Sequence, residues 1–112
     1  MDKYVIFAFN GNPTCFMHVL LNALDMENEG IDTKIILEGE AVRLIREMET
    51  TANSLYLVAK EKGLIDCICK ACSAKMGVLE YNETVGIPLV GDMSGHPPIA
   101  AYVKKGYQVI TL

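Results

Sequence analysis

The fold is decided at the start of the chain, by the stretch Tyr4-Val5-Ile6-Phe7-Ala8-Phe9. This run is continuously apolar and rich in β-branched and aromatic side chains, without the polar alternation of a strand that has one face in water. Such a run is typical of a strand buried on both faces, as in a parallel sheet covered by helices. We therefore expect the chain to begin with a fully buried strand of such a sheet.

Strands and helices alternate after the break at residues 10–13. Helices are expected at residues 14–29, capped by Thr14 and stopped by Gly30, and at 40–49, 53–62, 70–76 and 98–105. Further strands are expected at residues 33–37, 64–68 and 107–112, and residues 85–90 fit either a short strand or an ordered loop. Alternation with short turns predicts right-handed crossovers and therefore a three-layer α/β/α sandwich with a mostly parallel sheet of four or five strands.

The size and composition fit one small globular domain over residues 1–112. Of the 112 residues 51% are apolar and 21% charged, and the formal net charge is −4. An acidic chain lacks the dense basic surface that sequence-independent nucleic-acid binding needs, so no direct nucleic-acid partner is expected. No run of about 18 apolar residues is present, so no membrane span is expected either.

The N-terminal residues have no signal-peptide pattern, and the chain has no glycine-rich nucleotide-binding motif. We therefore expect a cytoplasmic protein without a nucleotide cofactor. Thiols stay reduced in that compartment, so four cysteines indicate catalysis, metal binding or burial rather than a disulfide framework.

In an open α/β sheet, ligands and chemistry gather beyond the carboxyl ends of the strands. Three connections should lie there: residues 10–15, residues 38–40 and residues 69–72. The third holds most of the cysteines, in Cys67-Ile68-Cys69-Lys70-Ala71-Cys72.

Cys69 is the first candidate nucleophile, because it falls where the third strand gives way to a helix. Unpaired N–H groups and the helix dipole lower the pKa of a thiol in the first turn, and Lys70 or Lys75 adds positive field. Cys72 lies one turn further on the same face, so it is a candidate resolving thiol. The alternative for Cys72 is simple packing against the sheet, since free cysteine behaves as a small apolar residue.

The other two cysteines have weaker claims. Cys15 begins the first helix and should also face the sheet edge, which makes it a candidate second thiol or a buried first-turn residue. Cys67 lies in the strand, on the same side as Cys69 by two-residue alternation, and core packing is its expected role.

No metal site and no cofactor are predicted. A zinc set of Cys67, Cys69, Cys72 and His96 is conceivable, but its C-x-C-x-x-C spacing straddles a strand and no second C-x-x-C pair is present. His96 precedes two prolines and could be a loop residue or a general base, and His18 lies within the first helix. Neither histidine is assigned a role.

The chain resembles the DsrE/DsrF-like (DsrEFH-like) proteins of sulfur transfer, whose fold is similar to flavodoxin. The resemblance is strongest at Cys69-Lys-Ala-Cys-Ser-Ala-Lys-Met-Gly77-Val78, and it extends to the closing Lys105-Gly-Tyr-Gln-Val-Ile110. In the family's sulfur carriers a cysteine ends a strand, and a helix of small residues follows and closes at a glycine eight residues on. Cys69 and Gly77 have that spacing.

The resemblance implies that Cys69 accepts sulfur as a persulfide and hands it from a donor protein to an acceptor protein. Cys72 has no general counterpart in the family, so a resolving role would be particular to this chain. Trimers or hexamers are also implied, as is membership of a sulfur relay such as the one that thiolates tRNA.

Two other functions stay open on the residues alone. The first is thiol–disulfide or peroxide reduction by Cys69, with Cys72 or Cys15 as the resolving thiol. The second is a non-catalytic oligomeric binding or scaffold subunit whose cysteines are incidental.

Overall fold

A five-stranded, entirely parallel sheet organises the computed structural model, which describes residues 2–112. The elements in chain order are β1 (Lys3–Ala8), α1 (Pro13–Asn28), β2 (Asp32–Leu37), the 3₁₀ helix η1 (Gly39–Arg43), α2 (Leu44–Thr50), α3 (Ser54–Glu61), β3 (Ile65–Cys69), α4 (Lys70–Lys75), α5 (Leu79–Asn82), β4 (Leu89–Val90), α6 (Ile99–Lys104) and β5 (Gln108–Thr111). The strand order is β4-β3-β2-β1-β5, and every pairing is parallel. The predicted three-layer α/β/α sandwich is confirmed.

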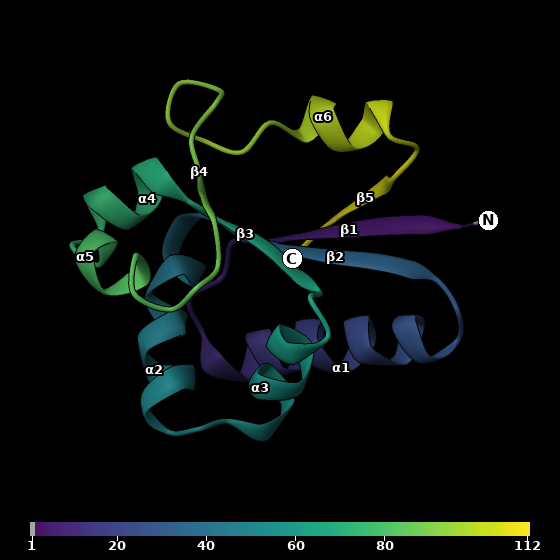
Figure 1. Ribbon diagram of the computed structural model, residues 1–112, viewed down its shortest axis with the longest axis horizontal. Coiled ribbons are helices and arrows are strands. Elements are labelled where there is room, and N and C mark those ends of the chain that lie inside the picture. The colour runs from purple at the N-terminus through teal and green to yellow at the C-terminus, as the bar shows by residue number, and fades with distance from the viewer. Residues whose placement is uncertain (1) are drawn as a thin grey trace.

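Different helices cover the two faces of the sheet, as Figure 1 shows: α1, α2 and α3 lie on one side and α6 lies on the other. The central strand β1 alternates between the two cores. Ile6 and Ala8 belong to the larger cluster with α1–α3, while Val5 and Phe7 pack with Tyr102 of α6. The expectation that this strand is buried on both faces is therefore confirmed.

Several element boundaries differ from the expectations. Asn12 rather than Thr14 caps α1, because its side chain accepts hydrogen bonds from the backbone N–H groups of Thr14 and Cys15 at 2.7 and 3.3 Å. The helix expected at residues 40–49 is divided into η1 and α2, and α5 was not expected. Of residues 85–90, only Leu89 and Val90 form a strand.

The break between β2 and α2 has a local cause at Gly39. Its φ of +53° lies in the left-handed region, and a Cβ there would stand 3.2 Å from the backbone oxygen of Phe9. Glycine lets the chain turn abruptly at this point, where a side chain would be strained. The turn leaves Glu38 at the carboxyl end of β2 with only 7% of its surface exposed.

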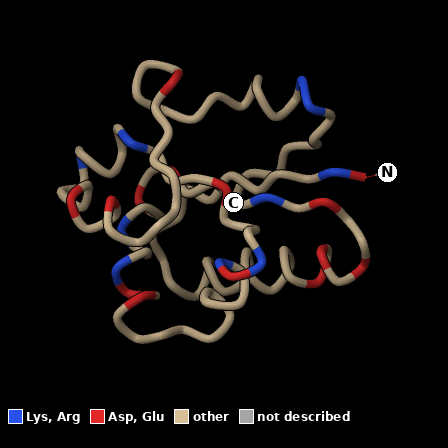
Figure 2. Tube along the Cα trace, in the orientation of Figure 1, with Lys and Arg blue, Asp and Glu red and all other residues tan. Residues whose placement is uncertain are grey.

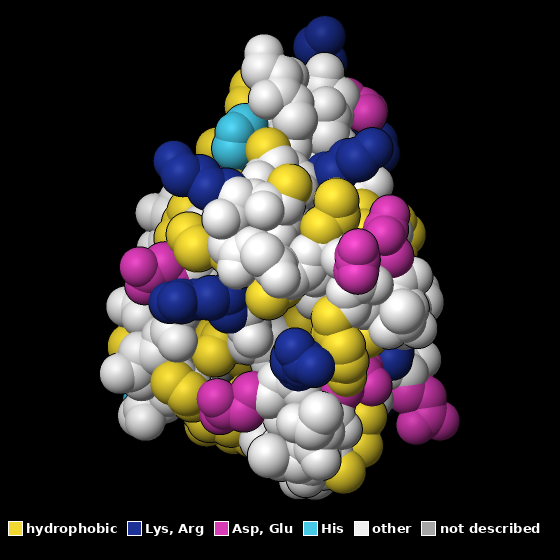
Figure 3. All heavy atoms as spheres, turned by 90° about the vertical axis from the view of Figure 1, so that its left-hand side faces the viewer, with side chains coloured by type: hydrophobic (Ala, Val, Ile, Leu, Met, Phe, Trp, Pro, Cys, Tyr) yellow, Lys and Arg dark blue, Asp and Glu magenta, His cyan; other side chains and the backbone are white. Residues whose placement is uncertain are grey.

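Charges of both signs are interspersed along the chain (Figure 2). The end of the molecule that carries α2, α4 and α5 likewise mixes acidic, basic and apolar side chains (Figure 3). This face therefore has no broad basic surface of the kind that binds nucleic acid without regard to sequence. Among the described helices, none is long and apolar enough to cross a membrane.

Candidate functional site

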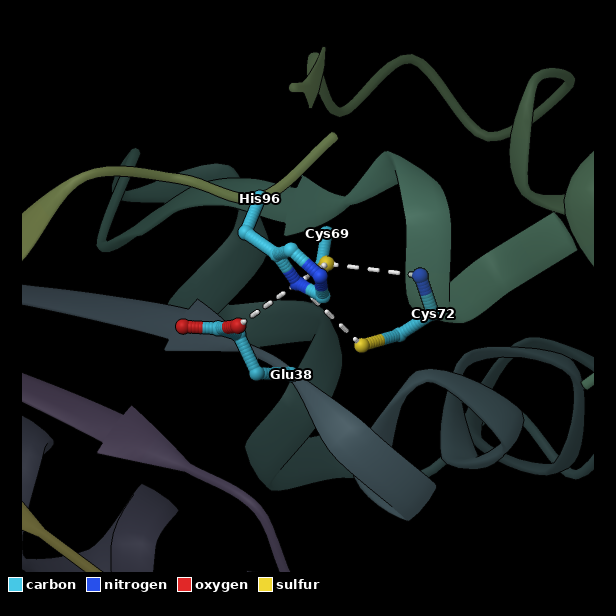
Figure 4. A group of neighbouring side chains, drawn as sticks. All are labelled: Glu38, Cys69, Cys72 and His96. Carbon is cyan, nitrogen blue, oxygen red and sulfur yellow. Dashed lines mark hydrogen bonds and ion pairs between the residues drawn. The ribbon is translucent and has the colours of Figure 1, made fainter. Parts of the chain in front are cut away.

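Four side chains from three separate connections meet at the carboxyl ends of β2 and β3 (Figure 4). Glu38 follows β2, Cys69 ends β3, Cys72 lies in α4 and His96 lies in the loop before α6. One carboxylate oxygen, two sulfurs and one imidazole nitrogen all lie within 4.8 Å of one another. We call these four residues the thiol cluster.

Cys69 is the N-cap residue of α4, as its position at the strand-to-helix junction predicts. Its Sγ accepts a hydrogen bond from the backbone N–H of Cys72 at 3.4 Å and lies 3.2 Å from His96 Nδ1. It also lies 3.7 Å from the backbone oxygen of Gly95, which an S–H can reach as a donor. The thiol therefore has three hydrogen-bonding partners on two segments, α4 and the loop that holds Gly95 and His96.

The Cys69 thiol is fully buried, and burial is the main reason why its pKa is raised to about 12. The N–H of Cys72 lowers the pKa, as expected for a helix start, but the neighbouring Cys72 thiol and Glu38 raise it further. The expected thiolate-stabilising effect is present but is outweighed, because burial excludes water from the thiol.

His96 Nδ1 is the atom on which the cluster converges. It lies 3.4 Å from Glu38 Oε1, 3.2 Å from Cys69 Sγ and 3.7 Å from Cys72 Sγ. The His96 side chain is 38% exposed, whereas that of Glu38 is 10% exposed, so the imidazole lies between the buried carboxyl and the solvent. Burial raises the pKa of Glu38, although His96 and Cys69 act in the opposite direction.

A short loop, residues 91–96, positions His96 against Cys69. The Ala71 N–H donates to the Gly95 oxygen at 2.8 Å, and Met93 and His96 exchange two backbone hydrogen bonds of 2.9 Å. Gly95 has a φ of +95°, and a Cβ there would stand 2.7 Å from the Cβ of Ala71. Only glycine allows the loop to approach α4 this closely. We call this segment the 91–96 loop.

A buried polar network holds α4 on its inner side, against α5 and η1. Ser73 Oγ donates to the Cys69 oxygen at 2.7 Å, and Asn82 Nδ2 donates to Ser73 Oγ and to the Val42 oxygen, both at 3.1 Å. Ser73 and Asn82 are fully buried. This network ties α4, α5 and η1 together, so the backbone that presents Cys69 and Cys72 is held on its inner side.

The remaining cysteines lie elsewhere, and all four are free thiols. Cys15 is exposed in the first turn of α1 and does not belong to the thiol cluster. Cys67 is buried as expected, with Sγ 3.6 Å from Tyr102 Oη, and burial raises its pKa to about 11. The expectation that Cys67 shares a side with Cys69 is wrong: it packs in the α6 cluster, whereas Cys69 packs in the other one and its side chain turns to cap α4.

The predicted residues are thus brought together in part. Cys69, Cys72 and His96 meet, while Cys15, Cys67 and His18 do not join them. Glu38 was missed as an individual residue, although residues 38–40 were expected at this edge of the sheet. Its signal is a carboxylate directly after a buried strand and before a glycine, a place where a charged side chain must find partners.

The fold and the thiol cluster define a class: a small α/β protein with two thiols, an imidazole and a carboxylate at the carboxyl ends of its parallel strands. The chain is 31% identical to the "Uncharacterized protein MJ0733" of Methanocaldococcus jannaschii over 114 residues, covering 97% of this chain and 93% of that one. It belongs to the same family as that protein.

A solved structure shares the fold along the whole chain. It is described as "Conserved Protein of Unknown Function BT1422 from Bacteroides thetaiotaomicron", with 26% identity and a TM-score of 0.76, over 99% of this chain and 95% of that one. No family model matches the chain.

Proposed function

We propose that this protein is a small cytoplasmic sulfur carrier of the DsrE type, in which Cys69 holds persulfide sulfur between a donor protein and an acceptor protein. The observation that carries the proposal is the setting of Cys69 Sγ, which caps α4 and lies within 3.4 Å of both the Cys72 N–H and His96 Nδ1. An N–H group and an imidazole are the groups that stabilise sulfur anions in reactive cysteines.

The transfer consists of two thiolate attacks. The Cys69 thiol first gives its proton to the nearby imidazole of His96, and the thiolate then attacks the outer sulfur of the donor's persulfide. The donor's S–S bond breaks, the donor leaves as a thiolate, and a new S–S bond leaves Cys69 as a persulfide. An acceptor thiolate attacks the outer sulfur of that persulfide in turn and returns Cys69 to its thiolate form. No net oxidation occurs.

Burial makes this chemistry conditional on the 91–96 loop. Cys69 is fully buried and its pKa is about 12 while the loop is closed, so the resting thiol is unreactive at neutral pH. Because His96 must stay beside the sulfur to take its proton, the part of the loop that moves is residues 91–95, which takes away the Gly95 contact and lets water reach the sulfur. We propose that a docking partner supplies the binding energy for this opening, which would limit sulfur transfer to specific partners.

A homo-oligomer, a trimer or hexamer, is part of the same proposal through the family resemblance. Ile99 and Val103, one turn apart on α6, are 40% and 55% exposed, and Leu21 of α1 is 50% exposed. These side chains supply apolar surface for subunit contacts, and light scattering coupled to size-exclusion chromatography measures the subunit number directly.

A second candidate, a dithiol oxidoreductase, is favoured by the proximity of the two cluster thiols. Cys69 Sγ and Cys72 Sγ both lie within 3.7 Å of His96 Nδ1, and they are spaced C-x-x-C. The sequence suggests Cys69 as the attacking thiol, but Cys69 is buried and Cys72 is partly exposed, so in this function Cys72 attacks a disulfide substrate and Cys69 resolves the mixed disulfide. The protein loses two electrons and the substrate gains them.

Intact-mass analysis after treatment with a small persulfide donor separates the two functions. Sulfur transfer predicts a gain of about 32 Da, whereas the dithiol mechanism predicts a loss of about 2 Da on exposure to a disulfide. Cys69→Ser should abolish the gain, and Cys15→Ser, which removes an exposed thiol outside the cluster, is the matched control and should retain it. A gain that survives in Cys69→Ser would refute the proposal.

A further inference from the structure

The three contacts of His96 Nδ1 within the thiol cluster have the spacing of neighbouring ligands in a tetrahedral metal site, and all four donor atoms lie within 4.8 Å of one another. With Zn–S bonds of about 2.3 Å and Zn–N or Zn–O bonds of about 2.0–2.1 Å, neighbouring ligands of a tetrahedron stand about 3.6 Å apart for sulfur and nitrogen and about 3.3 Å apart for oxygen and nitrogen. The two sulfur–nitrogen distances are 3.2 and 3.7 Å, and the oxygen–nitrogen distance is 3.4 Å. Each lies within about 0.4 Å of the tetrahedral value.

Hydrogen bonding alone does not account for this convergence. One imidazole nitrogen, His96 Nδ1, faces a carboxylate oxygen and two sulfurs, yet it carries at most one proton and can donate only one good hydrogen bond. Whether it donates or accepts, Nδ1 can therefore make a good hydrogen bond to only one of its three neighbours at a time, at a place where Glu38 and Cys69 are buried. A cation at the centre of the four atoms would be contacted by all of them at once.

We propose that Glu38, Cys69, Cys72 and His96 bind one Zn²⁺ ion as a four-ligand site. Two thiolates and an imidazole favour zinc over the hard ions magnesium and calcium, and C-x-x-C is a common spacing for a zinc ligand pair. Binding releases the protons of the two thiols. The carboxylate and two thiolates then offset the ion's charge, leaving the site one unit negative.

The surroundings of the four ligands are those of a built site. The N–H of Cys72 points at Cys69 Sγ, which is how backbone amides support metal-bound thiolates. The Ser73–Asn82 network fixes α4 on its inner side, and Gly95 holds the 91–96 loop against α4. The proposed set differs from the one considered from the sequence: Cys67 is not part of it, and Glu38 takes its place.

This inference goes beyond the proposed function and does not rest on it. Zinc would occupy the thiol that is proposed to accept sulfur, so the ion and the persulfide would exclude each other. A bound ion would also hold the 91–96 loop closed through His96, so the metal would inhibit any reaction of the Cys69 thiol.

The test is metal titration of the reduced, chelator-treated protein, with no sulfur donor present. Zn²⁺ is added in competition with a chromophoric chelator, and Co²⁺ is added separately as a spectroscopic probe. We expect one ion per chain, with thiolate-to-cobalt charge-transfer absorption and the intense visible bands of tetrahedral cobalt. Loss of a supporting group costs a metal site about 10–100-fold in affinity, so Cys72→Ser and His96→Gln, which remove ligands, should weaken binding by at least about 100-fold.

Matched controls and a milder variant keep the test decisive. Cys15→Ser and Cys67→Ala remove thiols outside the cluster and should leave affinity and spectrum unchanged. Glu38→Gln keeps the size of the side chain, so it should fold while weakening zinc binding. Circular dichroism confirms the fold of each variant.

Weak or substoichiometric binding, a cobalt spectrum without thiolate bands, or equal affinity in Cys72→Ser and wild type would each overturn the zinc proposal. Sulfur loading is measured separately on metal-free protein, so either proposal can fail while the other stands.

Discussion

Replacing Gly95 by alanine should expose Cys69 without unfolding the protein. The residue has a φ of +95°, and the new Cβ would stand 2.7 Å from the Cβ of Ala71. The left-handed region costs an L-residue about 1–2 kcal/mol, and overpacking typically costs about 1–3 kcal/mol. The closed loop should therefore lose about 2–5 kcal/mol, and since 1.4 kcal/mol is tenfold, even the lower value raises the open population roughly 30-fold.

Alkylation kinetics at neutral pH measure that population, with peptide mapping to separate the thiols. Cys69 should react at least about 10-fold faster in Gly95→Ala than in wild type, because alkylation needs the loop to open. Cys67 is buried in the opposite core and reports unfolding of the whole domain, so its rate should stay low.

Gly30→Ala is the matched control for Gly95→Ala. Gly30 has a φ of +83°, but a Cβ there meets nothing within 4 Å, so the variant carries backbone strain without crowding. It should lower stability slightly and leave the Cys69 rate unchanged. If Gly95→Ala leaves Cys69 as unreactive as in wild type, or speeds Cys69 and Cys67 equally, the 91–96 loop is not the cover of the site.

Three further outcomes follow from the same structure. Asn82→Ala removes hydrogen bonds to Ser73 and to the Val42 oxygen and leaves a cavity, so urea denaturation should show a free energy of unfolding lower by about 2–4 kcal/mol. A decrease below about 1 kcal/mol would contradict the anchoring role. Burial tends to raise the pKa of Glu49, but the hydrogen bond from Lys60 at 2.6 Å helps to lower it, and the net pKa is below its ordinary value of 4.5. The ionised carboxylate therefore stabilises the fold above pH 4.5, and this contribution is lost as the pH falls through the lower pKa of the folded state. Glu49→Gln should remove that part of the acid dependence of the unfolding free energy, and an unchanged pH profile would argue against it. One equivalent of Zn²⁺ should suppress sulfur loading of the metal-free protein, whereas full loading in its presence would show that the two do not share a site.

The sequence predicts the fold well because burial leaves a plain pattern. The apolar run of β1 indicates a strand covered on both faces, and strand–helix alternation restricts the connections to parallel crossovers. The caps illustrate the limit of this reasoning. Asn12 and Thr14 are both good N-cap residues, and the structure has Asn12 as the cap with Pro13 at the first helical position.

The site is predictable in its position but not in its composition. Cys69 and Cys72 are close in sequence, so a strand-to-helix junction is enough to place them together. Glu38 and His96 reach them through parallel pairing and through a loop whose path depends on Gly95, and neither is visible as a spacing. The pKa of Cys69 was also misjudged, because burial depends on how the 91–96 loop closes over α4.

The most direct test of the central claim is to map sulfur on the wild-type protein after exposure to a persulfide donor. The account predicts one added sulfur per chain, on the peptide that contains Cys69, with faster loading in Gly95→Ala and none in Cys69→Ser. Sulfur found on Cys15, or on no cysteine even when the 91–96 loop has been opened, would contradict it.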